Sequence, residues 1–285
     1  MQRVINILNF DGTLEPQKKY FSAPRSWVNF KDLQGTRLFC AEKSFYEIAR
    51  RLQKITKCGI SLIGSGDFHY VSYILLAEIN IPFTLLLFDN HSDLITSNRW
   101  SPLLSCSSWV AKALKLPNLK KVVIIGARPD TFYKVKPDIM NKVIYIPYYP
   151  VDKYLPNEHS QIRGYLNKYK PITAQGMHSA VMNLLPLIST NAVYISIDKD
   201  VLDKRYTVTN WDQGKMTINE LLVALQDIVS VKRVYGVDIC GEMPVSPAEY
   251  IQPRYQEAAK KNAMANIKIL KTLFKRRVHG KVCNL

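Results

Sequence analysis

The chain has 285 residues and a formal net charge of +16, with 47% hydrophobic and 22% charged residues. This composition is typical of a folded globular protein and excludes a disordered chain. No apolar run approaches the roughly 18 residues of a membrane span, and the start of the chain lacks the pattern of a secretory signal. The five cysteines are scattered without a Cys-x-x-Cys spacing. Neither a disulfide framework nor a thiolate zinc site is indicated, and a cytoplasmic location is expected.

Short apolar runs rich in β-branched residues alternate with longer stretches of helical periodicity. The runs have the length of strands, and in chain order they cover residues 4–10, 60–63, 83–88, 122–125, 143–146, 193–197 and 234–239. The helical patterns between them cover 42–57, 70–79, 107–116, 180–188 and 217–229. This order predicts an α/β fold with three layers, α-β-α, in which helices cover both faces of a mostly parallel central sheet.

The end of the chain is strongly basic. Eight Lys and Arg residues follow Glu257, the last acidic residue, and apolar residues lie between them at helical spacing. We expect a basic C-terminal helix over about 254–277 that docks one face and leaves the other in solvent. A nucleic-acid partner is not favoured, because no nucleic-acid-binding motif accompanies these charges. No repeat or Pro/Gly-rich linker divides the sequence, which favours a single domain over residues 1–285.

Acidic residues and histidines directly follow several predicted strands. In an open parallel sheet, ligands bind beyond the carboxyl ends of the strands, so a functional site is expected at these positions. The residues are His69 after the second run, Asp89, His91 and Asp93 after the third, Asp198 and Asp200 after the sixth, and Glu242 after the seventh.

The spacing of these residues predicts a metal site. Alternate residues of an extended segment point the same way, so the acids and the histidine of the Asp-x-His-x-Asp segment 89–93 can converge, as can the two acids of segment 198–200. Together with His69 they offer four carboxylates and two imidazoles, enough for two metal ions if one carboxylate bridges. Without metal, the clustered carboxylates would repel one another and raise their own pKa values.

The same residues resemble the motifs of the ureohydrolase superfamily, the group of arginase, agmatinase and formimidoylglutamase. That group has a Gly-Gly-Asp-His motif, an Asp-Ala-His-x-Asp motif, a Ser-x-Asp-x-Asp-x-x-Asp-Pro motif and a late Glu, in this order. The corresponding segments here are 66–69, 89–93, 196–203 and Glu242. The resemblance spans most of the chain and implies an arginase-like fold.

The resemblance also implies an activity and two Mn²⁺ ions per chain. The enzyme would hydrolyse a guanidino or amidino C–N bond and release urea or a related small amide. One ion would be held by His69, Asp89, Asp93 and Asp198, and the other by Asp89, His91, Asp198 and Asp200. Asp93 would also orient the attacking hydroxide, and Glu242 would pair with the substrate cation as carboxylates pair with guanidinium.

The sequence departs from the family pattern in several places. Phe68 stands where the first motif has Asp, Lys204 stands where the third has Pro, and Gly241 adds one residue before Glu242. The arginase and agmatinase branches also have a loop histidine as general acid, and residues 104–109 contain none. His159 and His178 remain as candidates by elimination, and surface or structural roles are expected for both.

The substrate is the least defined part of the prediction. Apolar residues follow Asp93 directly, which counts against free L-arginine and leaves a small guanidino or amidino compound, or an arginine side chain in a peptide. Trp211 and Asp212 are candidates for a pocket wall, with a Trp packed on its own loop as the alternative. Two other functions stay open: a single-zinc amide hydrolase of the deacetylase type, and a non-catalytic metal-containing binding protein. A homo-oligomer is possible, as in many family members.

Overall fold

The computed structural model describes residues 4–20, 25–55, 58–96, 103–132, 135–155, 160–246 and 248–275. At its centre is an eight-stranded sheet in the order β2-β1-β4-β10-β9-β5-β7-β8, in which every pair of neighbours is parallel. Its strands are β1 (Ile5–Asn9), β2 (Arg25–Asn29), β4 (Ile60–Leu62), β5 (Phe83–Phe88), β7 (Leu119–Ile125), β8 (Val143–Ile146), β9 (Ala192–Asp198) and β10 (Arg233–Cys240). A separate antiparallel pair consists of β3 (Phe39–Cys40) and β6 (Leu104–Ser105).

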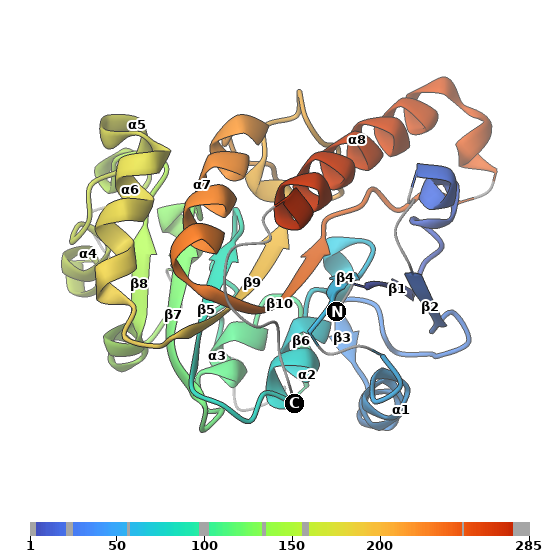
Figure 1. Cartoon of the computed structure of the whole chain (residues 1–285), viewed down its shortest axis with the longest axis horizontal. Coiled ribbons are helices and arrows are strands. Elements are labelled where there is room, and N and C mark those ends of the chain that lie inside the picture. Colours follow the sequence, from blue (N-terminus) through green and yellow to red (C-terminus); the bar gives the residue numbers. More distant parts are fainter. Residues whose placement is uncertain are drawn as a thin grey trace.

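Helices cover both faces of the sheet, as Figure 1 shows. One face packs against α1 (Glu42–Leu52), α2 (Val71–Ala77), α3 (Trp109–Ala113) and α4 (Ser160–Leu166). The other packs against α5 (Ile172–Gln175), α6 (Met177–Leu184), α7 (Ile218–Val231) and α8 (Pro253–Lys275). Because both faces are covered, β5 and β9 are buried along their whole length, which explains why their sequences are continuous apolar runs.

The structure confirms the predicted α/β architecture and adds elements that the pattern did not show. All seven predicted strands are present, and the eighth, β2, lies at the edge of the sheet with a half-exposed, mixed sequence. The helices α4 and α5 were not predicted, and α1 ends at Leu52 rather than at residue 57. In α7, Thr217 and Glu220 form the reciprocal capping box that marks its start.

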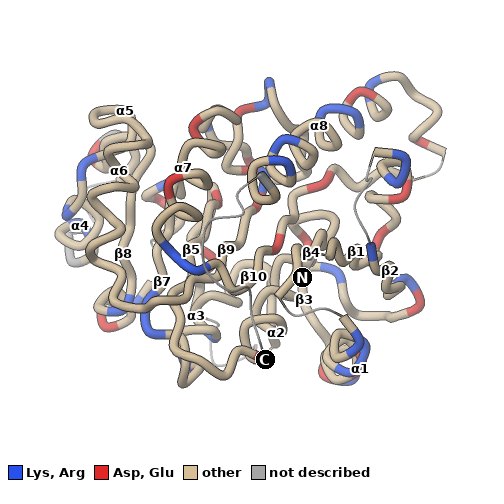
Figure 2. The backbone as a smooth tube through the Cα atoms, in the orientation of Figure 1, with Lys and Arg blue, Asp and Glu red and all other residues tan. Residues whose placement is uncertain are grey.

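Helix α8 is the basic helix expected near the C-terminus. It begins at Pro253 and is described to Lys275, so residues 276–277 of the predicted span lie outside the described residues. Lys260, Lys268 and Lys271 are exposed on it, and Figure 2 shows basic residues along its length. Within the described ranges, no helix has both the length and the apolar character to cross a membrane.

The order of the central strands places the site. The strands β4, β10, β9 and β5 are consecutive neighbours in the sheet and run parallel. Their carboxyl ends therefore meet at one edge, although they are far apart in the sequence. Three of these strands, β4, β5 and β9, lead into the predicted metal ligands, and β10 leads into Glu242, the predicted substrate contact.

Candidate metal centre

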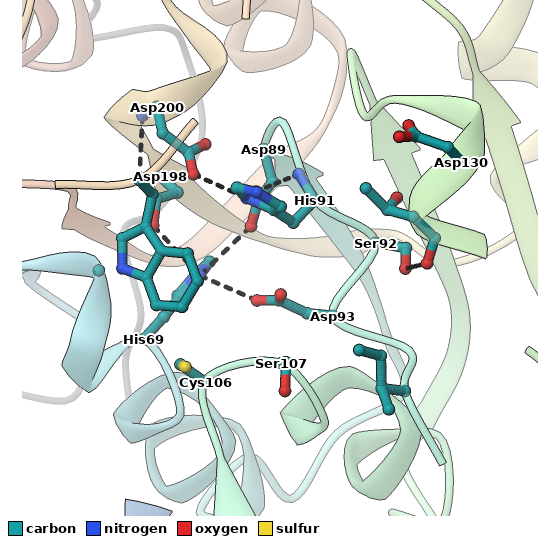
Figure 3. A pocket seen from close by; sticks show the side chains of 14 residues that line it. His69, Asp89, His91, Ser92, Asp93, Cys106, Ser107, Asp130, Asp198 and Asp200 are labelled. Carbon is teal, nitrogen blue, oxygen red and sulfur yellow. Dashed lines mark hydrogen bonds and ion pairs between the residues drawn. The ribbon is translucent and has the colours of Figure 1, made fainter. Parts of the chain in front are cut away.

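The six predicted ligands converge at the carboxyl ends of the central strands (Figure 3). Asp198 is the last residue of β9, and Asp200 lies in the 3₁₀ turn Lys199–Val201 that follows it. Asp89, His91 and Asp93 come from the loop after β5. His69 closes the 3₁₀ turn Gly66–Phe68 that follows β4.

A first group of ligands surrounds the Nδ1 atom of His69. This nitrogen lies 3.3 Å from Oδ2 of Asp89, 3.2 Å from Oδ2 of Asp93 and 3.6 Å from Oδ2 of Asp198. All four side chains are buried. Such an arrangement of one imidazole and three carboxylates has the donors that a divalent cation needs.

A second group lies beside the first and shares Asp89 with it. Nδ1 of His91 lies 2.8 Å from Oδ2 of Asp200 and 3.5 Å from Oδ1 of Asp89. The two oxygens of Asp89 thus face different groups, Oδ2 toward His69 and Oδ1 toward His91. This is the geometry of a carboxylate that could bridge two ions.

Hydrogen bonds from outside the cluster fix the orientation of two ligand side chains, His69 and Asp93. Ser196 donates to Oδ1 of Asp238 at 2.6 Å, and its hydroxyl lies 2.9 Å from Nε2 of His69. This leaves Nδ1 of His69 directed at the carboxylates, as the second ring nitrogen of a metal-binding histidine is usually held by a partner. The indole of Trp109 donates to Oδ2 of Asp93 at 2.6 Å. Asp93 itself has a left-handed backbone, with φ of 51°, which a non-glycine residue rarely adopts.

The electrostatics are those of a concentrated negative cluster. Burial, followed by the charges of neighbouring aspartates, raises the pKa of Asp198 to about 7 and that of Asp200 to about 6. Burial lowers the pKa of His91, but Asp200 and Asp89 outweigh this effect and raise the pKa to about 12. Four aspartates face only two histidines in this cluster, so a cation placed between the carboxylates would reduce their mutual repulsion.

One buried oxygen of the cluster is left without a hydrogen bond. Oδ2 of Asp89 is buried and has no hydrogen-bond partner among the described residues. Buried polar atoms are normally paired, so an unpaired carboxylate oxygen within a cluster of acids is costly unless something else binds it. The donor set of carboxylates and imidazoles suits Mn²⁺ and related divalent metals.

A pocket of about 250 Å³ opens onto this cluster. All six candidate metal ligands belong to its lining. The remaining walls consist of Gly66, Ser92, Ile95, Cys106, Ser107, Asp130, Thr131 and Trp211. No Lys or Arg belongs to the described lining, so beyond the two histidines of the ligand cluster the pocket offers acids, hydroxyl groups and apolar surface.

The two rim residues predicted to contact substrate differ in position. Trp211 lines the pocket, its indole donates to Oδ1 of Asp67 at 3.0 Å, and its ring centre lies 5.7 Å from that of His91. The side chain of Asp212 is 80% exposed and lies outside the described lining, 3.5 Å from the Arg128 guanidinium. Only Trp211 is therefore placed to form a wall of the site.

Glu242 lies outside the described pocket lining, and its carboxylate pairs with other buried polar side chains. It is 3% exposed, pairs with the buried ammonium of Lys199, and accepts hydrogen bonds of 2.8 Å from Gln17 and Asn266. The residue before it, Gly241, lies against Asp198. Gly241 has φ of +85°, and a Cβ there would lie 2.5 Å from Oδ1 of Asp198, so no side chain fits at that position. The carboxylate of Glu242 lies among Lys199, Gln17 and Asn266, outside the described pocket lining, and its contact with substrate stays a prediction.

No described histidine takes the place of the missing loop acid. His178 is 66% exposed on α6 and pairs with Asp227 of α7 at 2.8 Å. His159 lies outside the described residues. Cys106 and Ser107 stand in the pocket wall where the family loop would be sought, and burial, followed by the charge of Asp93, raises the pKa of the Cys106 thiol to about 12.

Sequence reasoning missed the roles of three residues beside the ligands. The contact of Trp109 with Asp93 depends on how the loop after β5 folds, and no motif signals it. Ser196 lies within the third motif, and its place two residues before Asp198 puts it on the same side of β9, within reach of His69. Cys240 directly ends β10, and its position after an apolar run was the available signal.

The class that the fold and the site define is an α/β protein with a parallel sheet, in which carboxylates and imidazoles that could hold a metal ion gather beyond the central strands. The model of the arginase family matches residues 6–273, and the chain belongs to this family. A protein of Thermotoga maritima, described as uncharacterized, is 30% identical over 275 residues, which cover 96% of this chain and 91% of the relative.

Solved structures of the family have the same fold. The structure is similar to formimidoylglutamase from Bacillus subtilis, with a TM-score of 0.65 and 16% identity over 97% of this chain and 88% of that one. It is also similar to arginase from Bacillus cereus, with a TM-score of 0.63 and 15% identity over 98% of this chain and 100% of that one. The predicted arginase-like fold is confirmed, and at these identities the likeness concerns the fold alone.

Proposed function

We propose that this protein is a binuclear metal-dependent hydrolase that cleaves a C–N bond of a guanidino or amidino compound and releases urea or a related small amide. The observation that carries the proposal is the position of Asp89, whose two carboxylate oxygens face two adjacent ligand groups. Membership of the arginase family supports the same chemistry. A single-metal centre, as in a deacetylase-like amide hydrolase, would not need a carboxylate shared in this way.

The residues present fit two divalent ions, for which Mn²⁺ is the proposed metal. His69, Asp89, Asp93 and Asp198 would hold one, and Asp89, His91, Asp198 and Asp200 the other. When bound, such ions lower the pKa of water and polarise the substrate. The chain itself holds the ligands in place, buries their carboxylates and provides the walls that position the substrate.

Asp93 is the proposed catalytic acid–base residue. Its carboxylate lines the pocket, and the Trp109 indole holds its Oδ2, so the group is fixed in orientation. It would accept the proton of the attacking water and return it to the leaving nitrogen, a task that the family's loop histidine shares. Among the described histidines, His69 and His91 are proposed metal ligands and His178 lies outside the pocket lining. This assignment also makes Trp109 a positioning residue.

The pocket favours a cationic substrate. The described lining contains five aspartates and no Lys or Arg, so it attracts an amidinium group and offers no partner for a substrate carboxylate. Ile95 and Trp211 provide apolar wall for the remainder of the molecule. We therefore propose a small guanidino or amidino compound without a nearby carboxylate, or an arginine side chain within a peptide, in preference to free L-arginine.

The proposal is tested by a hydrolysis screen on Mn²⁺-loaded protein. The panel contains agmatine, guanidinobutyrate, formiminoglutamate, arginine and arginine-containing peptides, and the products measured are urea and ammonia. We expect release from an amidino substrate by the wild-type protein, and in Asp89→Ala and Asp198→Ala we expect no release and at most one bound ion per chain.

The control variant is Asp138→Ala, which removes an exposed aspartate outside the pocket lining and should change neither readout. Unchanged turnover in Asp89→Ala would refute the proposal. One zinc per chain without Mn²⁺ activation would favour the amide hydrolase, and metal without any hydrolysis would favour a binding protein.

A further inference from the structure

Cys240 lies inside the metal centre but has no part in the function proposed above. It is the last residue of β10 and is fully buried. The register of the sheet pairs it with Asp198, the last residue of β9. Its thiol donates to Oδ2 of Asp198 at 3.1 Å, so sulfur lies against the oxygen that also faces His69.

Three different donor types meet at this point. The ligand atoms of His69, Asp198 and Cys240 all lie within 4.8 Å of one another. His69 belongs at the same time to the group with Asp89 and Asp93. An independent observation points to a ligand here, because the buried Oδ2 of Asp89, which has no hydrogen-bond partner, lies 3.3 Å from Nδ1 of His69.

The second ligand group differs in its chemistry. Asp89, His91 and Asp200 offer only oxygen and nitrogen atoms. Cys106, the other cysteine near the site, lines the pocket but belongs to none of the three groups of converging ligands found among the described residues. The two metal positions are thus chemically unequal, and Cys240 alone makes them so.

We propose that Cys240 is a thiolate ligand of the ion nearest His69, and that it gives this position a higher affinity for Zn²⁺ relative to Mn²⁺ than the position between His91 and Asp200 has. Thiolate favours zinc, whereas carboxylate ligands suit manganese. On binding, the thiol proton leaves to solvent, and a metal–sulfur bond replaces the hydrogen bond to Asp198. The inference rests on the proposed metal centre and specifies which metals occupy it.

The experiment uses Co²⁺ as a spectroscopic probe of sulfur ligation. Metal-free wild-type protein, Cys240→Ser and the matched control Cys106→Ser are each loaded with Co²⁺, and bound cobalt and near-ultraviolet absorption are measured. We expect a thiolate-to-cobalt charge-transfer band in wild type and Cys106→Ser, and its loss in Cys240→Ser. The preference for Zn²⁺ over Mn²⁺ in competition should fall by about tenfold or more in Cys240→Ser.

X-ray absorption of the zinc-loaded wild-type protein needs no variant and should show a sulfur neighbour at about 2.3 Å. It decides the question if Cys240→Ser does not fold. Cobalt bound without a charge-transfer band, or a band that survives in Cys240→Ser, would overturn the inference and leave the proposed hydrolase intact. Failure of the wild-type protein to bind any metal would overturn both.

Discussion

If Glu242 is a structural partner of the buried Lys199, then removing its charge should lower the stability of the protein by a predictable amount. Lys199 is fully buried, and Glu242 accepts from it and from Gln17 and Asn266. The change Glu242→Gln removes the negative charge and leaves the ammonium of Lys199 buried without a counter-ion. Breaking such a pair costs about 3–5 kcal/mol. At about 2–4 °C per kcal/mol for a chain of this size, Tm should fall by roughly 10 °C.

The assay is thermal unfolding followed by circular dichroism at a fixed metal concentration, together with KM for the best substrate. The double variant Lys199→Met with Glu242→Gln contains neither charge and keeps an amide oxygen for the surrounding donors, so it should recover most of the lost stability. A Glu242→Gln protein with unchanged Tm and a raised KM would refute this reasoning, because it would place the carboxylate on the substrate.

Three further predictions concern the metal centre. Trp109→Phe keeps the ring but removes the hydrogen bond to Asp93, so kcat should fall by about tenfold with little change in KM, and an unaltered kcat would contradict the positioning role. Gly241→Ala places a Cβ against Asp198 and should weaken metal binding by about tenfold or more, measured by titration; unchanged affinity would contradict the close approach. Finally, the raised pKa values of Asp198 and Asp200 mean that the folded metal-free protein holds more protons than the unfolded chain between about pH 4 and 7. Its stability should therefore fall as pH rises through that range, and the gain in Tm on adding Mn²⁺ should be larger at pH 8 than at pH 5.5; a constant gain would contradict this sign.

The sequence predicts the fold and the meeting of the ligands for a definite physical reason. Strands buried on both faces are continuous apolar runs, and parallel strands bring their carboxyl ends to one edge. Acids and histidines directly after such runs therefore lie close together, whatever their separation in the chain. The structure brings all six predicted ligands together in this way.

Features that depend on one backbone angle or on long-range packing were not predictable. Gly241 has a left-handed backbone and Glu242 pairs with the buried Lys199, whereas a motif search sees only an acid near the expected place. The indole of Trp109 reaches Asp93 only because the loop after β5 bends back on α3. The edge strand β2 has the mixed sequence of a half-exposed segment, so it lacks the apolar pattern that revealed the other strands.

The metal content of purified protein tests the central claim most directly. Metal-free protein is loaded with Mn²⁺ and Zn²⁺ together, separated from free ions and analysed for both elements. We predict two divalent ions per chain in wild type, and at most one in Asp89→Ala, because Asp89 faces both ligand groups. No bound metal in wild type, or two ions retained in Asp89→Ala, would contradict the account.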